Sequence, residues 1–274
     1  MNNDITIIIP VHEVNDENTR LFKRAVESVK ECQKHYKAGK LVTTVVSPLS
    51  STSCLISGVS TESTMSCDKW ITNDSGDTSY CGQVNYAVQH IDTKYFSILE
   101  FDDEYLEKWF KFFEQYLYGN EDISVFLPLN IVTDESGEHW QYGNEAPLAE
   151  FFSSEPGIVD FDCLQDWSGF TLPGAIVNRE DFINVGMYKP SIKLAHDYEL
   201  LMRMTNRKLR VMVVPKEGYK HIVGRNGSLT DIYRKEMEGT DDVQKWFDLA
   251  KREYQYTEDR KKGILGKKNK EELK

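Results

Sequence analysis

A short, continuously apolar segment near the start of the chain is followed by a helical pattern and then by a second apolar segment. Ile5–Pro10 is rich in β-branched residues and ends in proline, which is typical of a strand buried on both faces. Residues 19–36 carry apolar side chains at helical spacing, at Leu21, Phe22, Ala25, Val26 and Val29. Residues 41–46 are again apolar and β-branched. A strand–helix–strand unit of this kind places its two strands parallel, so the opening predicts an α/β fold.

The rest of the chain continues this alternation of strands and helices. Further strands are expected at residues 68–72, 95–99, 123–132, 171–178 and 209–214. Further helices are expected at residues 80–91, 105–118, 179–184, 196–205 and 241–254. Residues 48–66 are expected to form a loop, and the polar residues 134–166 a longer one that serves as a lid or an acceptor platform. We expect a single domain over residues 1–256, with a mixed, mostly parallel, Rossmann-like central sheet flanked by helices, and a charged tail over residues 257–274.

Charge and hydropathy narrow the range of functions. The net charge of −11 argues against a broad nucleic-acid-binding surface. The longest strongly apolar run, residues 5–11, is too short to cross a bilayer, and the first residues lack the basic segment of a signal peptide. We therefore expect a cytoplasmic protein, or one of the host cytoplasm if the chain is viral, without integral membrane contact. From Lys251 onward the chain is basic, with nine Lys/Arg against five Asp/Glu, and this tail is either a solvated end or an arm that touches phosphate or a membrane surface.

Four carboxylates in five residues follow the strand expected at residues 95–99. They belong to the segment Glu100-Phe101-Asp102-Asp103-Glu104. Ligands of open α/β sheets bind at the carboxyl ends of the strands, which is where this segment lies. Clustered carboxylates repel one another, and a divalent cation such as Mg²⁺ or Mn²⁺ is the usual counter-charge. From these residues alone, an acidic first turn of a helix explains the cluster equally well.

Several segments, taken in order, resemble the motifs of the family 2 glycosyltransferases, which have the GT-A fold. Residues 5–12 resemble the family's first strand and the Pro-Val-Tyr-Asn type motif at its end. Residues 73–85 stand at its loop-and-helix segment, which ends in Asn, and residues 96–103 resemble its Leu-Asp-x-Asp-Asp motif. Residues 174–203 resemble its later Gly…Glu-Asp-Tyr-Glu-Leu segment, and His221 its late histidine. The resemblance covers residues 4–230 and includes the possibility of a viral or phage member.

The resemblance implies a metal-dependent, inverting hexosyl- or pentosyltransferase that moves a sugar from a nucleoside-diphosphate sugar to an acceptor hydroxyl. Asp197 stands at the family's catalytic base, and Asp102 at the metal-binding Asp of its DxD motif. Glu100 replaces the first Asp of that motif, and Asp103 is a neighbour of the metal or of the diphosphate. The resemblance makes His221 a third metal ligand or a diphosphate donor, whereas a lone histidine near a strand end is more often an ordinary polar residue.

The resemblance also implies residues that contact the donor and the acceptor. The expected donor contacts are Pro10, His12, Glu13, Asp74, Asn85, Glu100 and Arg225. The expected acceptor contacts are Asp166, Trp167 and His196. The family has an acid after its second strand that recognises the nucleobase, but residues 45–50 contain no carboxylate, so Asp74 or Asp68 is the expected substitute. A UDP-sugar is the first expectation for the donor, and the missing acid puts uridine in doubt.

Several alternatives remain open at this point. The acceptor is a glycan, a lipid-linked precursor, a protein or a hydroxylated base in DNA, as in phage DNA modification. The aromatic residues Trp140, Tyr142, Trp167 and Phe170, in or near the long middle segment, either stack on such an acceptor or pack under the long loop. A second function is a catalytically weak or inactive relative that binds a nucleotide or a glycan, which the Glu100 replacement motivates. A metal-dependent nucleotidyltransferase is a third, although the chain lacks the Gly-rich basic loop of such enzymes.

Overall fold

A computed structural model describes residues 3–12, 16–48, 67–145, 155, 157–192, 194–224 and 244–252. Its strands are β1 (Ile5–Pro10), β2 (Leu41–Pro48), β3 (Lys69–Asn73), β4 (Tyr95–Ile98), β5 (Glu104–Tyr105), β6 (Ile123–Thr133), β7 (His139–Gly143), β8 (Ile158–Val159), β9 (Ile176–Asn178) and β10 (Arg210–Ile222). Its helices are α1 (Asp16–His35), α4 (Tyr80–Gln89), α5 (Trp109–Leu117), α6 (Phe161–Asp166), α7 (Arg179–Asn184) and α8 (His196–Asn206), and residues 244–252 are also helical.

All of these strands belong to one mixed sheet. Its order is β3-β2-β1-β4-β9-β6-β10-β5, with β7 paired to β6 and β8 paired to β10. The strands β1, β2, β3, β4, β6 and β10 run in one direction. The strands β5, β7, β8 and β9 run against them, and β9 lies antiparallel between β4 and β6. The mixed, mostly parallel sheet predicted from the sequence is therefore confirmed.

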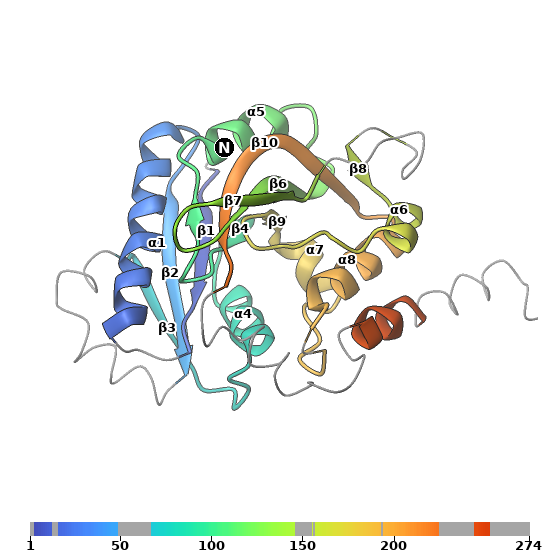
Figure 1. Cartoon of the computed structure of the whole chain (residues 1–274), viewed down its shortest axis with the longest axis horizontal. Coiled ribbons are helices and arrows are strands. Elements are labelled where there is room, and N and C mark those ends of the chain that lie inside the picture. The colour runs from blue at the N-terminus through green and yellow to red at the C-terminus, as the bar shows by residue number, and fades with distance from the viewer. Residues whose placement is uncertain are drawn as a thin grey trace, which may run out of the picture.

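Helices cover both faces of this sheet. In Figure 1, α1 and α5 lie on one side of the sheet and α4, α7 and α8 on the other. The first side buries a core that includes Phe22 of α1 and Trp109 of α5, and the second a core that includes Val84 of α4 and Leu201 of α8. The strand β1 is buried along its whole length because it contributes to both cores. Among the described residues, no helix is long and apolar enough to cross a membrane.

Several elements differ from the sequence-based expectation. Residues 104–105 form the short strand β5 instead of the start of a helix, because Tyr105 N–H donates to Ser28 Oγ at 3.1 Å and its hydroxyl donates to Ser97 Oγ at 2.7 Å. Part of the expected loop at residues 134–166 folds as β7, β8 and α6. The strand β10 extends to Ile222, and its register shifts near Pro215, which has no N–H to donate to the neighbouring strand.

The strand β9 is shorter than expected because the chain turns before it. Gly174 has a φ of 82° there, and a Cβ at this position would lie 2.6 Å from the Tyr219 ring. The Gly174 N–H donates to Ile98 O at 2.9 Å, and its oxygen accepts from Trp109 Nε1 at 2.9 Å. Since β9 is antiparallel to β4, this turn lies at the carboxyl end of β4.

Candidate active site

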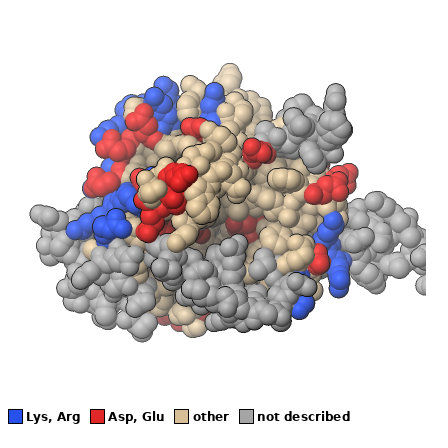
Figure 2. All heavy atoms as spheres, viewed as in Figure 1, with Lys and Arg blue, Asp and Glu red and all other residues tan. Residues whose placement is uncertain are grey.

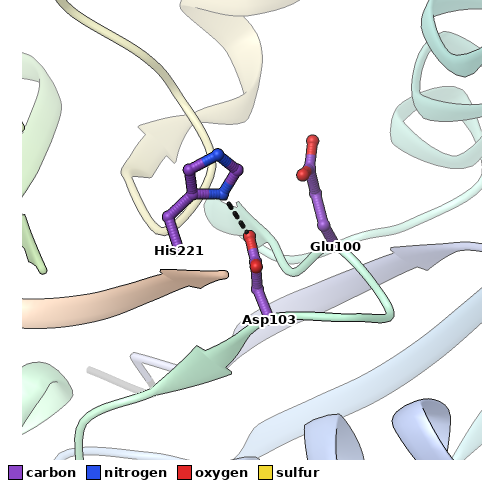
Figure 3. A group of neighbouring side chains, drawn as sticks. All are labelled: Glu100, Asp103 and His221. Atoms are coloured by element: carbon purple, nitrogen blue, oxygen red, sulfur yellow. Dashed lines mark hydrogen bonds and ion pairs between the residues drawn. The ribbon is translucent and has the colours of Figure 1, made fainter. Parts of the chain in front are cut away.

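Three side chains from different parts of the sequence meet at the carboxyl edge of the sheet. Glu100 follows β4, Asp103 precedes β5, and His221 lies near the end of β10. One ligating atom from each of the three lies within 4.8 Å of the others. Figure 3 shows the Glu100 carboxylate and the His221 ring pointing into the same space, with Asp103 between their bases. The sheet therefore places two carboxylates and one imidazole around a common point.

Hydrogen bonds hold this group in place. Asp103 is 1% exposed, and its Oδ2 lies 2.9 Å from His221 Nδ1. The other oxygen, Oδ1, accepts from Ile222 N–H at 2.8 Å. The Glu100 backbone N–H donates to the Tyr219 hydroxyl at 3.1 Å. Asp103 therefore ties the acidic segment to the end of β10.

The raised pKa values of Glu100 and His221 indicate an excess of negative charge in this group. Burial and the nearby Asp103 and Asp102 carboxylates raise the pKa of Glu100 to about 8. Burial lowers the pKa of His221, but the Asp103 carboxylate outweighs this effect and the net result is a pKa of about 9. Near neutral pH, protons therefore occupy Glu100 and His221 and offset the charge of their neighbours.

The same group has the chemistry of a divalent-cation site. Carboxylate oxygens and an imidazole nitrogen are suitable ligands for Mn²⁺, and carboxylates suit Mg²⁺. A cation there would take over the role of the protons on Glu100 and His221. Figure 2 shows acidic side chains recessed in a hollow near the middle of the displayed face. The residues present therefore fit a bound cation.

The two remaining acids of the segment have other neighbours. Arg24 of α1 donates from Nη2 to the Asp102 backbone oxygen at 2.8 Å. Its Nε lies 3.1 Å from Glu104 Oε1, and Lys220 Nζ lies 3.5 Å from the same oxygen. Asp102 is not one of the three described residues that converge within 4.8 Å, so its role as a metal ligand stays a prediction. The group includes Asp103 instead, which the motif treated as a neighbour.

Asp197, the predicted base, lies in the first turn of α8 and is 8% exposed. Its Oδ1 accepts from the Tyr188 hydroxyl at 2.6 Å, and its Oδ2 accepts from Leu172 N–H at 3.0 Å. Burial and the Asp197 carboxylate raise the pKa of Tyr188, so that its hydroxyl stays protonated and remains a donor. Asp197 also contributes to the raised pKa of Glu100, which places the base and the acidic group in one electrostatic environment.

The rings of Tyr80 and His196 lie beside that of Tyr188, whose hydroxyl bonds Asp197. The ring centroid of Tyr80, the first residue of α4, lies 5.2 Å from that of His196 and 6.3 Å from that of Tyr188. The Tyr80 hydroxyl and His196 Nδ1 are buried and have no hydrogen-bond partner within the described part of the chain. Sequence reasoning missed Tyr80, Tyr188 and Tyr219, because no local pattern distinguishes them among the 14 tyrosines.

Three of the predicted donor contacts lie at the end of β1 or just after the ends of β1 and β3. Pro10 is buried at the end of β1, and His12 Nδ1 lies 2.8 Å from the Gln83 amide. Burial lowers the pKa of His12, so its ring is neutral near pH 7. Asp74 is exposed and accepts from the Tyr86 hydroxyl at 2.8 Å. The donor roles of these residues stay predictions.

Two further donor-side predictions fall outside the described residues, and a third has a defined partner. Glu13 and Arg225 belong to the segments that the structure does not describe. The side chain of Asn85 bonds the backbone of Tyr188 at both its amide atoms, at 2.9 and 3.0 Å. Asn85 is thus engaged with the segment that carries the Tyr188 hydroxyl to Asp197.

Three exposed aromatic residues lie on β7 and just after α6. Trp140 and Tyr142 of β7 are 59% and 44% exposed, and Trp167, which follows α6, is 50% exposed. Asp166 is also exposed. Figure 2 shows a surface with few charged side chains in the upper middle of the displayed face, bordered on its left by a group of acidic side chains. Such a surface has the chemistry to stack on sugar rings or bases.

Comparisons with known proteins bear on the fold. No family model and no curated protein matches the sequence. The structure is similar to Staphylococcus aureus TarS 1-349 in complex with UDP-GlcNAc, with a TM-score of 0.62 and 13% identity over 91% of this chain and 65% of that chain. It is also similar to the mannosyltransferase PcManGT from Pyrobaculum calidifontis in complex with GDP-Man and Mn²⁺, with a TM-score of 0.56 and 14% identity over 81% of this chain and 58% of that one.

These likenesses define the architecture. The chain spans less than two thirds of the length of each of these two proteins. At 13–14% identity the likeness shows the fold alone, and both neighbours have the GT-A arrangement. The chain therefore has the GT-A fold, and this prediction from the sequence motifs is confirmed.

Proposed function

We propose that this chain is a family 2-like glycosyltransferase that transfers a sugar from a nucleoside-diphosphate sugar to an acceptor hydroxyl. The observation that carries the proposal is the pairing of two features within one GT-A fold. One is the cation-compatible group of Glu100, Asp103 and His221. The other is the buried carboxylate of Asp197, which accepts one hydrogen bond on each oxygen and acts electrostatically on Glu100.

On the donor side, Glu100, Asp103 and His221 would hold a divalent cation, together with Asp102 if its carboxylate turns toward the group. When bound, the cation supplies positive charge that stabilises the nucleoside diphosphate as a leaving group. The neutral His12 ring and the exposed Asp74 carboxylate lie on the side where the nucleoside is expected. UDP-GlcNAc and GDP-Man are bound by the two structural neighbours, so both nucleotide classes belong in a donor panel.

On the acceptor side, Asp197 would accept the proton of the attacking hydroxyl. As the new bond forms between the acceptor oxygen and the anomeric carbon, the bond from that carbon to the diphosphate oxygen breaks. The electron pair of that bond leaves with the nucleoside diphosphate, and the configuration at the anomeric carbon inverts. The hydrogen bonds from Tyr188 and Leu172 keep the Asp197 carboxylate oriented for this transfer. Trp167, Asp166 and His196 remain the proposed acceptor contacts.

The proposal is tested by measuring nucleoside diphosphate release from UDP- and GDP-sugars in the presence of Mn²⁺ and glycan, lipid-linked, protein or hydroxylated-DNA acceptors. Asp197→Ala should abolish release while metal-dependent nucleotide binding persists. Asp103→Ala should lose both, and Asp102→Ala should lose both if Asp102 is a ligand as the motif implies. Asp134→Asn is a matched control, because Asp134 lies in an exposed turn and bonds only its local neighbours in the described chain.

Two results would change the assignment. Wild-type protein that binds nucleotides with Mn²⁺ but never releases diphosphate would indicate the non-catalytic, ligand-binding alternative. Retention of the anomeric configuration in the product would contradict the role of Asp197 as the base of a single inverting step.

A further inference from the structure

Both oxygens of the Asp197 carboxylate accept hydrogen bonds from residues in irregular segments of the chain. The Tyr188 hydroxyl donates to Oδ1, and Leu172 N–H donates to Oδ2. Residues 187–188 and 171–172 belong to no helix or strand, so no ladder of backbone hydrogen bonds fixes their positions. Isolated bonds hold the neighbouring groups: Met187 N–H donates to Phe182 O at 2.9 Å, Met187 O accepts from Arg203 Nη2 at 2.6 Å, and Leu172 O accepts from Ala175 N–H at 2.8 Å. The backbone of Tyr188 and of Thr171 is held by side chains of two other residues.

An asparagine side chain holds the first of these segments. Asn85 Nδ2 donates to Tyr188 O at 2.9 Å, and Tyr188 N–H donates to Asn85 Oδ1 at 3.0 Å. The amide thus binds the donor and the acceptor of one residue at once, which fixes both the position and the orientation of that backbone. Asn85 lies in the middle of α4, a helix that packs against the sheet.

A second asparagine holds the other segment in the same way. Asn144 Nδ2 donates to Thr171 O at 3.0 Å, and Thr171 N–H donates to Asn144 Oδ1 at 2.9 Å. Leu172, whose N–H donates to Asp197, directly follows Thr171. Asn144 is 2% exposed and follows β7 with a φ of 54°, a backbone conformation that asparagine adopts more readily than most residues.

We propose that Asn85 and Asn144 are positioning residues for the base Asp197, each holding the backbone that carries one of its two hydrogen-bond donors. The proposal rests on the proposed transferase function. One asparagine comes from α4, and the other directly follows β7. Through them, two elements far apart in the sequence control the orientation of one carboxylate.

The substitutions that test this proposal can be chosen to spare the backbone. Asn85→Ala introduces the residue with the best helix propensity, so α4 itself should not be weakened. Asn144→Gly introduces the residue that best tolerates a positive φ, so the turn should not be strained. Asn178→Gly is the matched control, because the Asn178 side chain accepts from Glu180 and Asp181 N–H and so caps α7 away from Asp197.

Steady-state kinetics are the first readout. Asn85→Ala and Asn144→Gly should each lower kcat by about ten- to hundredfold, since a misplaced base loses catalytic efficiency steeply. The KM for the donor and the Kd for nucleoside diphosphate with Mn²⁺ should change less than about twofold, because under this proposal the Asn85 amide bonds the Tyr188 backbone instead of the donor, and Asn144 bonds Thr171. Asn178→Gly should leave kcat unchanged.

A double-mutant cycle separates positioning from a general loss of structure. Tyr188→Phe removes the donor that Asn85 positions, so adding Asn85→Ala to Tyr188→Phe should lower kcat by much less than it does in the wild type. Adding Asn144→Gly should still lower it, because that substitution acts through Leu172. Full additivity of Asn85→Ala with Tyr188→Phe would contradict the proposed route.

Hydrogen exchange gives a readout that does not depend on turnover. Asn144→Gly should speed exchange of the Leu172 amide, as Asp197→Ala should, while the amides of β4 keep their protection. Unchanged exchange at Leu172, or a kcat for both asparagine variants equal to that of Asn178→Gly, would overturn the proposal. If the wild type releases no diphosphate at all, the transferase function fails, and the exchange result still decides whether Asn144 holds the Leu172 segment.

Discussion

Cation binding at the group of Glu100, Asp103 and His221 should depend strongly on pH. Without a cation, Glu100 has a pKa of about 8 and His221 a pKa of about 9. A cation requires both side chains in their deprotonated forms, so it competes with the protons that they carry. Affinity should therefore rise with pH through the range in which these protons are lost, and binding should release protons to the buffer.

The size of the effect follows from the pKa of Glu100. Competition from protons lowers the affinity for the cation by a factor of 1 + 10^(pKa − pH). With a pKa of about 8, this factor is about 30 at pH 6.5 and close to one at pH 9. The His221 side chain is 40% exposed, so solvent screens its interactions and we use only the direction of its contribution, which is the same. Affinity should thus fall at least about 30-fold from pH 9 to pH 6.5.

Isothermal titration calorimetry with Mn²⁺ alone measures this directly. Titrations at several pH values give the affinity, and buffers that differ in ionisation enthalpy give the number of protons released. Glu100→Gln should bind more weakly and with a shallower pH dependence, whereas Asp134→Asn should behave like the wild type. Affinity that is constant between pH 7 and 8.5, with no proton release, would refute the reasoning.

Two further predictions concern stability in the absence of metal. Glu100→Gln should raise the free energy of unfolding by about 1–3 kcal/mol at pH 8.5 and by little at pH 5. A carboxyl whose pKa is raised by folding destabilises the fold only as pH rises above the pKa that it has in the unfolded chain. Urea denaturation at both pH values measures the difference. Gly174→Ala should cost about 2–4 kcal/mol by the same assay, since its Cβ meets Tyr219, whereas Gly76→Ala, with a φ of 85° and nothing within 4 Å, should cost about 1–2 kcal/mol.

Much of the fold around the site could be predicted from the sequence. Buried strands such as Ile5–Pro10 carry an unmistakable apolar pattern, and the rule that ligands bind at the carboxyl ends of parallel strands located the acidic segment. The resemblance to a family placed His221 near these acids, although it lies 118 residues from Asp103, and the structure brings the two together. The fold prediction is confirmed because it used strong periodicity and ordered motifs, whereas the roles of the acids and of His221 stay predictions.

Other features have no local signal. The strand β5 has only two residues, and β7 is exposed along most of its length, so neither shows the alternation that identifies a half-buried strand. The bonds of Asn85 to Tyr188 join residues 103 apart, and those of Asn144 to Thr171 join residues 27 apart. Such contacts depend on how the loops cross the sheet edge, which no residue pattern encodes.

The antiparallel direction of β9 has a consequence for how a chain of this kind can change its specificity. In the parallel strands β1 and β4, the segment that meets the ligand edge follows the strand, but at β9 it precedes the strand. Under the proposed function, the donor-side residues Pro10, His12, Asp74 and Glu100 come from several short segments at the ends of strands, and β10 adds His221. The proposed acceptor contacts Asp166 and Trp167 belong to one described stretch, residues 157–175, which ends in the turn at Gly174, whereas His196 comes from α8. That stretch could therefore be exchanged as a unit, in evolution or by engineering, so that the sugar is transferred to a new acceptor while the donor contacts stay the same.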